Sequence, residues 1–180
     1  MKYIYLDHAS TTPIKKRVLK EMLPYITENF GNPSSVHLLG KKSKEAIENS
    51  RIKTANALNC NKNEVYFTSS ATESNNWVLK AIAFSNKKKG KHIITTKIEH
   101  ASILNTCKFL EKQGFNITYL PVNKYGMISL EDLKNSISDE TILISIMFAN
   151  NEIESIQPIK KIGEIAEKKI FIFIQMLFKQ

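Results

Sequence analysis

The 180-residue chain is poor in several residue types, and each shortage excludes a class of protein. Six glycines and five prolines are too few for a collagen-like or linker-rich chain. A hydrophobic fraction of 42% together with a charged fraction of 24% excludes a wholly disordered chain. What remains is a globular protein with the length of one domain or slightly more.

Long apolar runs and clustered cysteines are also missing. No run reaches the length of a membrane-spanning helix, and the N-terminus lacks the apolar core of a signal peptide. Cys60 and Cys107 are too few for a disulfide framework, and no Cys-x-x-Cys or Cys/His spacing predicts a metal site. We therefore expect a cytoplasmic protein with no membrane partner and no metal.

Arginine is scarce although the net charge is +9, because Arg17 and Arg51 are the only arginines among 26 basic residues. Proteins that read nucleic acids favour arginine for bidentate contacts to bases and phosphates. The abundance of Lys, Ile and Asn is typical of an AT-rich genome. The densest basic run, residues 87–91, lies between a helical and a strand pattern and is interpreted as a solvated turn. No direct nucleic-acid partner is expected.

The apolar periodicity alternates between helix and strand along the chain. It predicts helices over residues 16–25, 41–58, 72–84, 102–113 and 130–137, and a last helix from about Pro158. It predicts strands over residues 64–68, 92–96, 116–121, 141–149 and 170–173. This order indicates an α/β fold in which βαβ units build a mostly parallel sheet with helices on both faces.

Ligands of open α/β sheets bind at the carboxyl ends of the strands, so the residues just after each strand are the candidates. Ser70 and Glu73 fit a capping box, and the helix that starts there either is simply capped or also holds an anion. His100 either caps the next helix or stacks on a planar ligand and moves a proton. Residues 150–152, Asn-Asn-Glu, form either a turn or a hydrogen-bonding site.

Together these signals predict a binding site for a planar, phosphorylated cofactor at one edge of one sheet. The chain has no Gly-x-x-x-x-Gly-Lys-Ser/Thr loop, which argues against a nucleoside triphosphate. It also has no Gly-x-Gly-x-x-Gly motif at the start of a helix, which argues against a nicotinamide dinucleotide.

Several ordered motifs resemble the N-terminal part of cysteine desulfurases, pyridoxal 5'-phosphate enzymes of the class V aminotransferase group. The clearest are Thr-Ser-Ser-Ala-Thr-Glu-Ser-Asn-Asn at 68–76 and Ala-Asn-Asn-Glu-Ile at 149–153. Further matching segments are 5–13, 31–35 with His37 and Gly40, 98–100, 145–148 and 157–159. The similarity runs in register from about residue 3 to residue 168. It implies an incomplete large domain of the fold-type I pyridoxal-phosphate transferases.

The resemblance also implies roles for four residues. Ala71 and Thr72 would hold the cofactor phosphate through backbone and hydroxyl donors. His100 would stack on the pyridine ring and take part in proton transfer, which makes it the candidate catalytic residue. Asn151 would bind near the phenolic oxygen of the ring and the substrate carboxylate. The cofactor itself supplies the electron sink.

The family reaction converts L-cysteine to L-alanine and enzyme-bound persulfide sulfur, for iron–sulfur cluster assembly or tRNA thiolation. A homodimer and a sulfur-acceptor or iron–sulfur scaffold protein are the partners that the resemblance implies. The chain departs from the family pattern at three positions. Ser70 and Glu154 stand where glycine is usual, and Phe148 stands where histidine is frequent. A turn that needs a positive φ would be strained at Glu154.

The largest departure is at the C-terminus. Family members continue with a His-x-Asp-Ala-x-Gln strand, the Schiff-base lysine and a loop that carries the nucleophilic cysteine. We expect an N-terminal segment at 1–15, a partial large domain at 16–168, an aberrant tail at 169–180 and no C-terminal small domain. Cys107 lies on an apolar helical face and is interpreted as a core thiol. These 180 residues are therefore expected to be inactive alone and poorly soluble.

A frameshift would explain the tail. Residues 169–180 can be back-translated so that a frame two bases later reads Asn-Ile-Tyr-Phe-His-Thr-Asp-Ala-Val-Gln-Ala, which contains the expected motif. We hypothesise a frameshifted gene or a sequencing error, and a DNA sequence with no compatible second frame at codon 169 would refute it. Alternatives to the desulfurase are another class V enzyme such as a selenocysteine lyase, a non-catalytic dimerising fragment and, last, a nucleic-acid binder.

Overall fold

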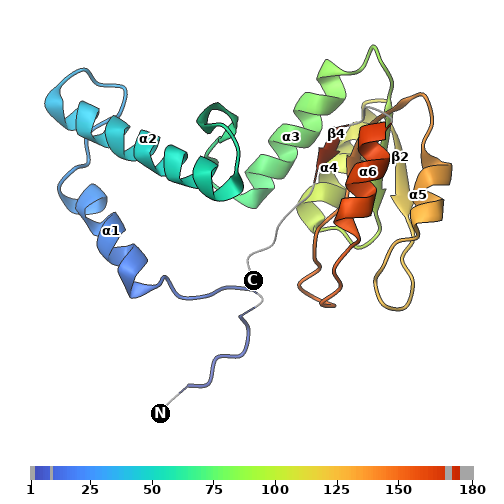
Figure 1. Cartoon of the computed structure of the whole chain (residues 1–180), viewed down its shortest axis with the longest axis horizontal. Coiled ribbons are helices and arrows are strands. Elements are labelled where there is room, and N and C mark those ends of the chain that lie inside the picture. Colours follow the sequence, from blue (N-terminus) through green and yellow to red (C-terminus); the bar gives the residue numbers. More distant parts are fainter. Residues whose placement is uncertain (1–2, 9, 169–171, 175–180) are drawn as a thin grey trace. The chain divides into compact units, whose positions relative to one another are not determined.

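The computed structural model describes residues 3–8, 10–168 and 172–174. The chain divides into two compact units, Met1–Thr68 and Ser69–Gln180, whose elements are labelled in Figure 1. The domain limits expected at 15/16 and 168/169 stay predictions. The tail that the frameshift hypothesis concerns lies largely outside the described residues.

The first unit consists of helices α1 (Lys16–Thr27) and α2 (Leu38–Leu58) and the short 3-10 helix η1 (Lys62–Glu64). Helix α2 begins at His37, whose side chain accepts a hydrogen bond from the Gly40 amide, and ends at Asn59 in the left-handed region. Asparagine tolerates that conformation better than most residues, which suits it to a helix C-terminus.

The strand predicted over residues 64–68 is wrong. Asn61 and Glu64 form a reciprocal capping box around η1, and residues 65–68 have no regular structure. The Val65 carbonyl accepts a hydrogen bond from the Arg51 guanidinium. A strand is stabilised by cross-strand neighbours, and here a side chain of α2 occupies the position of a ladder partner.

The second unit is a four-stranded parallel sheet in the order β2-β1-β3-β4. Its strands are β1 (His92–Thr96), β2 (Asn116–Leu120), β3 (Thr141–Ser145) and β4 (Ile172–Ile174). Its helices are α3 (Ala71–Ser85), α4 (Ala101–Lys112), α5 (Leu130–Ser136) and α6 (Ile159–Lys168). The predicted α/β class and parallel sheet are confirmed.

Helices cover both faces of this sheet, as Figure 1 shows. Side chains of α3 and α4 pack with Ile93 and Leu143 in one apolar cluster. Side chains of α5 and α6 pack with Ile94 and Ile144 in the other. Successive strand residues point to opposite faces, so a continuous apolar strand supplies both clusters.

Strand β1 spans the predicted residues, whereas β3 ends at Ser145 although the apolar run continues to residue 149. Ile146 and Met147 are buried without being part of the ladder. The predicted strand at 170–173 is matched by β4 at residues 172–174, and residues 170–171 lie outside the described residues.

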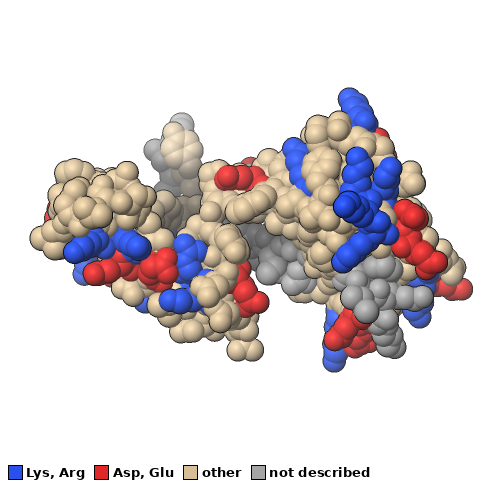
Figure 2. All heavy atoms as spheres, turned by 90° about the horizontal axis from the view of Figure 1, so that it is seen from above, with Lys and Arg blue, Asp and Glu red and all other residues tan. Residues whose placement is uncertain are grey.

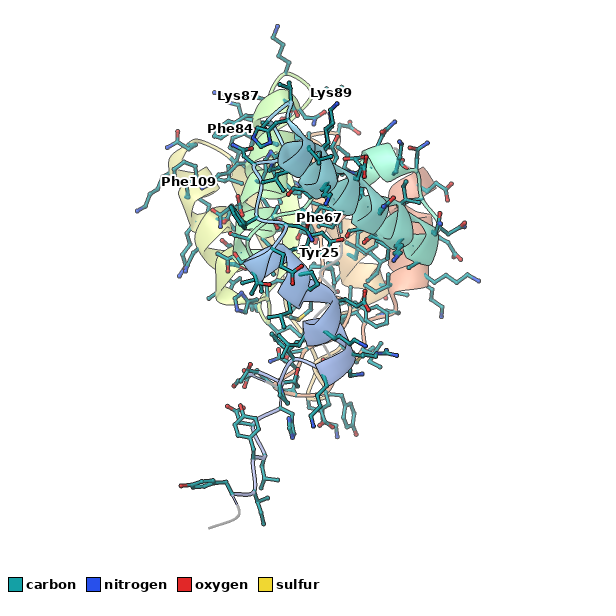
Figure 3. The ribbon with its side chains drawn as sticks, turned by 90° about the vertical axis from the view of Figure 1, so that its left-hand side faces the viewer. Tyr25, Phe67, Phe84, Lys87, Lys89 and Phe109 are labelled. Carbon is teal, nitrogen blue, oxygen red and sulfur yellow. The ribbon has the colours of Figure 1, made fainter. Side chains whose placement is uncertain are left out.

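Lys87, Lys88 and Lys89 lie exposed in the turn between α3 and β1, as predicted for a solvated turn. Figure 3 shows Lys87 and Lys89 pointing away from the ribbon. In Figure 2, basic and acidic side chains are interspersed over much of the visible face. Among the described residues, every helix is too short or too polar to cross a lipid bilayer.

Candidate functional site

The predicted site residues follow two neighbouring strands of the sheet. Strands β1 and β3 pair in parallel, so their carboxyl ends meet at one edge. His100 lies a few residues beyond the end of β1, and Asn151 lies a few residues beyond the end of β3. His100 is exposed and Asn151 is half-buried.

Glu99 joins these two strand ends. Its Oε1 accepts hydrogen bonds from the Met147 amide at 2.8 Å and from the Thr96 hydroxyl at 3.0 Å. Its Oε2 is buried and has no hydrogen-bond partner among the described residues. Burial raises the pKa of Glu99 to about 7, against the two hydrogen bonds, which lower it.

A second side chain joins the same two ends in the opposite direction. The Asn150 side-chain amide donates to the Ile98 carbonyl at 3.0 Å, and its Oδ1 accepts from the amides of Glu152 and Ile153. The buried Asn150 therefore closes the turn that carries Asn151 and fastens it to the segment before His100.

His100 is the N-cap of α4. Its Nδ1 accepts a hydrogen bond from the Ser102 amide at 3.1 Å and lies 2.8 Å from the Ser102 hydroxyl. Since Nδ1 accepts, the proton of the neutral imidazole lies on Nε2. The capping role considered for this residue is confirmed, and it uses Nδ1.

The N-terminus of α3 connects to His100 through two side chains. Asn75, one turn into α3, donates from its side-chain amide to the Ser102 hydroxyl at 2.8 Å, and that hydroxyl lies against His100. Ala71 and Thr72 are the first two residues of α3, and both are exposed. The described structure therefore links all three predicted segments through hydrogen bonds.

The predicted capping box at α3 is half correct. Ser70 accepts a hydrogen bond from the Glu73 amide at 3.2 Å, as expected. The Glu73 carboxylate accepts from the amide and the hydroxyl of Ser69, both at 2.7 Å, a contact that the prediction did not include. These bonds lower the pKa of Glu73. The Glu73 carboxylate therefore binds Ser69, the residue before the N-cap Ser70.

Glu154 adopts a φ of 55°, so the side chain stands in a backbone conformation that favours glycine. The strain predicted for this departure from the family pattern is confirmed by that angle. Phe148, the other departure in this segment, is half-buried. Cys107 is fully buried and burial raises its pKa to about 12, with further contributions from Glu99 and Glu111. The predicted core thiol is confirmed.

Sequence reasoning named Ala71, Thr72, His100 and Asn151 but gave no role to the residues that connect them. Glu99 and Asn75 stand inside the motifs that resemble the family, Ser102 follows shortly after one of them, and all three are buried polar residues. The sequence signal for Glu99 was a glutamate three residues after a strand that is buried on both faces, since a carboxylate there needs a partner.

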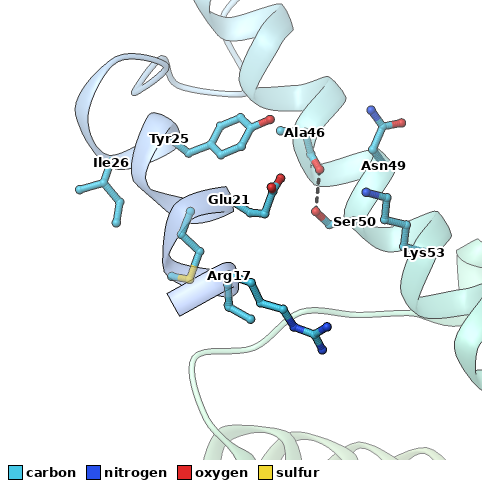
Figure 4. A pocket seen from close by; sticks show the side chains of 10 residues that line it. Arg17, Glu21, Tyr25, Ile26, Ala46, Asn49, Ser50 and Lys53 are labelled. Atoms are coloured by element: carbon cyan, nitrogen blue, oxygen red, sulfur yellow. Dashed lines mark hydrogen bonds between the residues drawn. The ribbon is translucent and has the colours of Figure 1, made fainter. Parts of the chain in front are cut away.

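A groove in the first unit is lined by other residues. Figure 4 shows it between α1 and α2, with Glu21 and Tyr25 on one side and Asn49, Ser50 and Lys53 on the other. It contains none of the residues predicted to bind a cofactor. Its lining mixes apolar side chains of α1 with charged side chains, among them Arg17, Glu21 and Lys53.

The donor set at the sheet edge fits a pyridoxal phosphate. The first amides of a helix have no acceptor within the helix, and the N-terminal dipole favours a phosphate. The exposed Thr72 adds a hydroxyl donor, His100 adds an aromatic ring and Asn151 adds an amide. Among the described residues, no group of three or more His, Cys, Asp or Glu side chains could hold a metal ion.

Comparison with known proteins shows the family. Residues 4–176 match the model of the family described as aminotransferase class-V. The chain belongs to that family. It is 60% identical over 172 residues to the cysteine desulfurase IscS of Methanosarcina thermophila, and 57% identical to that of Clostridium botulinum (strain Kyoto / Type A2). Each alignment covers 96% of this chain and 43% of the relative.

Solved structures of family members have the same fold. A NifS-like protein superposes with a TM-score of 0.92 at 39% identity, over 96% of this chain and 48% of that one. The protein SspA in complex with cysteine superposes with a TM-score of 0.91 at 40% identity, over 95% and 49%. The chain therefore spans less than half the length of the relatives it matches.

Proposed function

We propose that the chain supplies the phosphate- and ring-binding part of a pyridoxal-phosphate-dependent cysteine desulfurase. The observation that carries this proposal is the hydrogen-bonded connection between the N-terminus of α3, His100 and the Asn150–Asn151 turn. That connection occurs in a chain 60% identical to a cysteine desulfurase.

Each site residue has a defined task in this proposal. The amides of Ala71 and Thr72 and the Thr72 hydroxyl bind the phosphate. His100 stacks on the ring and holds a proton on Nε2, since Nδ1 faces Ser102. Asn151 donates to the phenolic oxygen. The bound cofactor supplies an electron sink for the bonding electrons of the amino acid.

The substrate is L-cysteine, which yields L-alanine and persulfide sulfur. A family member with a similar structure was solved in complex with cysteine, which supports this choice. The sulfur serves iron–sulfur cluster assembly or tRNA thiolation through a sulfur acceptor or scaffold protein. The protein acts in the cytoplasm as a homodimer, with no membrane or nucleic-acid partner, and residues 16–168 form part of its large domain.

These 180 residues by themselves do not turn over. The Schiff-base lysine and the persulfide-forming cysteine of the family are expected beyond the matched part of the relatives. The chain incubated with pyridoxal phosphate and cysteine should release no sulfide above the rate of the free cofactor. Sulfide release together with a Schiff-base absorbance would contradict this part of the proposal.

The binding part of the proposal is tested with pyridoxine 5'-phosphate. This analogue lacks the aldehyde and so cannot react with the many surface lysines. Equilibrium dialysis should show one site per chain, with much weaker binding of pyridoxine, which lacks the phosphate. Thr72→Val and Asn151→Ala should each weaken binding by roughly tenfold, the value of one hydrogen bond to a charged or polar ligand group.

Asn105→Ala is the matched control, because Asn105 is an exposed asparagine on α4 outside the site. Its affinity should equal that of the unsubstituted chain. Equal affinities for pyridoxine 5'-phosphate and pyridoxine, or equal losses in Asn105→Ala and Asn151→Ala, would refute the proposed site.

A further inference from the structure

Glu99 is an unusual residue to find inside this sheet edge. Only 6% of its surface is exposed, and one carboxyl oxygen has no hydrogen-bond partner among the described residues. Leaving a buried polar atom unpaired costs about 1–3 kcal/mol, so packing alone would favour an apolar side chain here. The contacts of the paired oxygen are therefore of interest.

The paired oxygen connects segments that are distant in sequence. Oε1 accepts from Thr96 at the end of β1 and from the Met147 amide just beyond β3. The Met147 amide lies beyond the end of β3, and it donates to the Glu99 carboxylate. Glu99 thus takes the place of a ladder partner at the point where the two strands stop pairing.

A second side-chain hydrogen bond joins the same two segments. Asn150 donates to the Ile98 carbonyl, so residues 98–99 and 147–150 hold each other through one carboxylate and one amide. Both residues proposed to contact the cofactor ring follow directly: His100 comes after Glu99, and Asn151 comes after Asn150. A shift between the two strand ends would therefore move His100 relative to Asn151.

We propose that Glu99 is a positioning residue, whose carboxyl group fastens the end of β1 to the end of β3 and sets the spacing between His100 and Asn151. This inference deepens the proposed function and rests on it. Glu99 does not touch the cofactor in this scheme. It acts through the backbone of the residue that follows it.

The test compares Glu99→Gln with Glu99→Ala in the full 180-residue chain. Glutamine keeps the Oε1 acceptor for Thr96 and Met147, whereas alanine removes it. Amide hydrogen exchange followed by NMR should show the Met147 amide exchanging roughly tenfold faster or more in Glu99→Ala, with rates near those of the unsubstituted chain in Glu99→Gln. Core amides such as Ile94 should stay protected in both variants.

Affinity for pyridoxine 5'-phosphate should follow the same order. It should fall roughly tenfold in Glu99→Ala and stay within about twofold in Glu99→Gln, because only the acceptor matters for positioning. Glu164→Ala is the matched control, since Glu164 is exposed on α6, and it should change neither measurement.

Equal exchange at Met147 in all variants, or a glutamine variant as impaired as the alanine variant, overturns the inference. If Glu99→Ala does not fold, Thr96→Val replaces it, because that change removes one donor to Oε1 and should loosen the same amide. Failure of the unsubstituted chain to bind pyridoxine 5'-phosphate refutes the proposed function instead, and Met147 exchange then still decides whether Glu99 joins the strand ends.

Discussion

At the scale of single residues, Glu99 makes stability depend on pH because its pKa differs between the folded and unfolded chain. Burial raises the pKa from 4.5 to about 7 in the fold. Between these values the folded chain binds one more proton than the unfolded chain, so the free energy of unfolding falls as pH rises. The titratable group that shares this environment is the Cys107 thiol on α4.

We expect Glu99→Gln to abolish this fall of the unfolding free energy with rising pH. The unsubstituted chain should lose about 3 kcal/mol of unfolding free energy between pH 4.5 and pH 8 from this group, and the variant should not. Urea denaturation at pH 5, 6, 7 and 8 measures the difference. Parallel pH profiles for the two proteins would show that the carboxyl group is not protonated in the fold.

Glu154 is the second residue that is unfavourable at its position, here because of its backbone angle. Its φ of 55° is a glycine conformation. Glu154→Gly should therefore raise the unfolding free energy by roughly 1 kcal/mol, the strain relieved less the entropy that glycine adds to the unfolded chain. Thermal or urea denaturation would measure this gain.

Glu154→Ala separates the backbone effect from the loss of charge. Alanine keeps the β-carbon that causes the strain, so this variant should gain nothing. A gain of the same size in both variants would mean that the carboxylate, and not the backbone angle, was unfavourable.

At the scale of elements, His92 ties three parallel strands together at the amino end of the sheet. Its Nδ1 lies 2.8 Å from the Thr141 hydroxyl on β3, and its Nε2 lies 2.8 Å from the Thr118 hydroxyl on β2. Burial lowers the pKa of His92 and thus favours the neutral ring. The sheet is thus cross-linked by side chains at both ends, by His92 at one and by Glu99 at the other.

His92→Ala should lower the unfolding free energy by about 2 kcal/mol, because it removes the hydrogen bonds to Thr118 and Thr141, although the Thr141 hydroxyl still accepts from the Ser138 amide. The exposed His8 provides the control, and His8→Ala should leave stability unchanged. Protection factors from hydrogen exchange should fall most at the amino ends of β1 to β3. Equal urea midpoints for the two variants would exclude a cross-linking role for His92.

At the scale of the whole molecule, the two units differ in how much apolar surface they bury. The second unit contains both apolar clusters, whereas no residue of the fully described α1 is buried. Met22 and Ile26 on α1 are 42% and 63% exposed. Exposed apolar faces of this kind promote association.

The purified chain should therefore self-associate as its concentration rises, despite its net charge. Sedimentation velocity at several concentrations measures this, and Met22→Lys with Ile26→Lys should shift the distribution toward the monomer. Lys20→Arg on the same helix is a control that should change nothing. A chain that stays monomeric at every concentration would show that these side chains do not drive association.

The sequence alone was sufficient for the α/β class, the parallel sheet and the limits of β1, because these depend on local periodicity and on apolar runs. It was also sufficient for the family and for Cys107 as a core residue. It failed at residues 64–68, where no strand forms among the described residues and Arg51 binds the Val65 carbonyl.

The hydrogen bonds that hold the site residues depend on tertiary packing. The Glu99–Met147 and Asn75–Ser102 bonds join residues 48 and 27 positions apart, and no local pattern predicts such pairs. The positive φ of Glu154 likewise depends on the backbone conformation, which only the structure gives. Periodicity reports which face of an element is buried, whereas hydrogen-bond partners and backbone angles depend on how the elements pack.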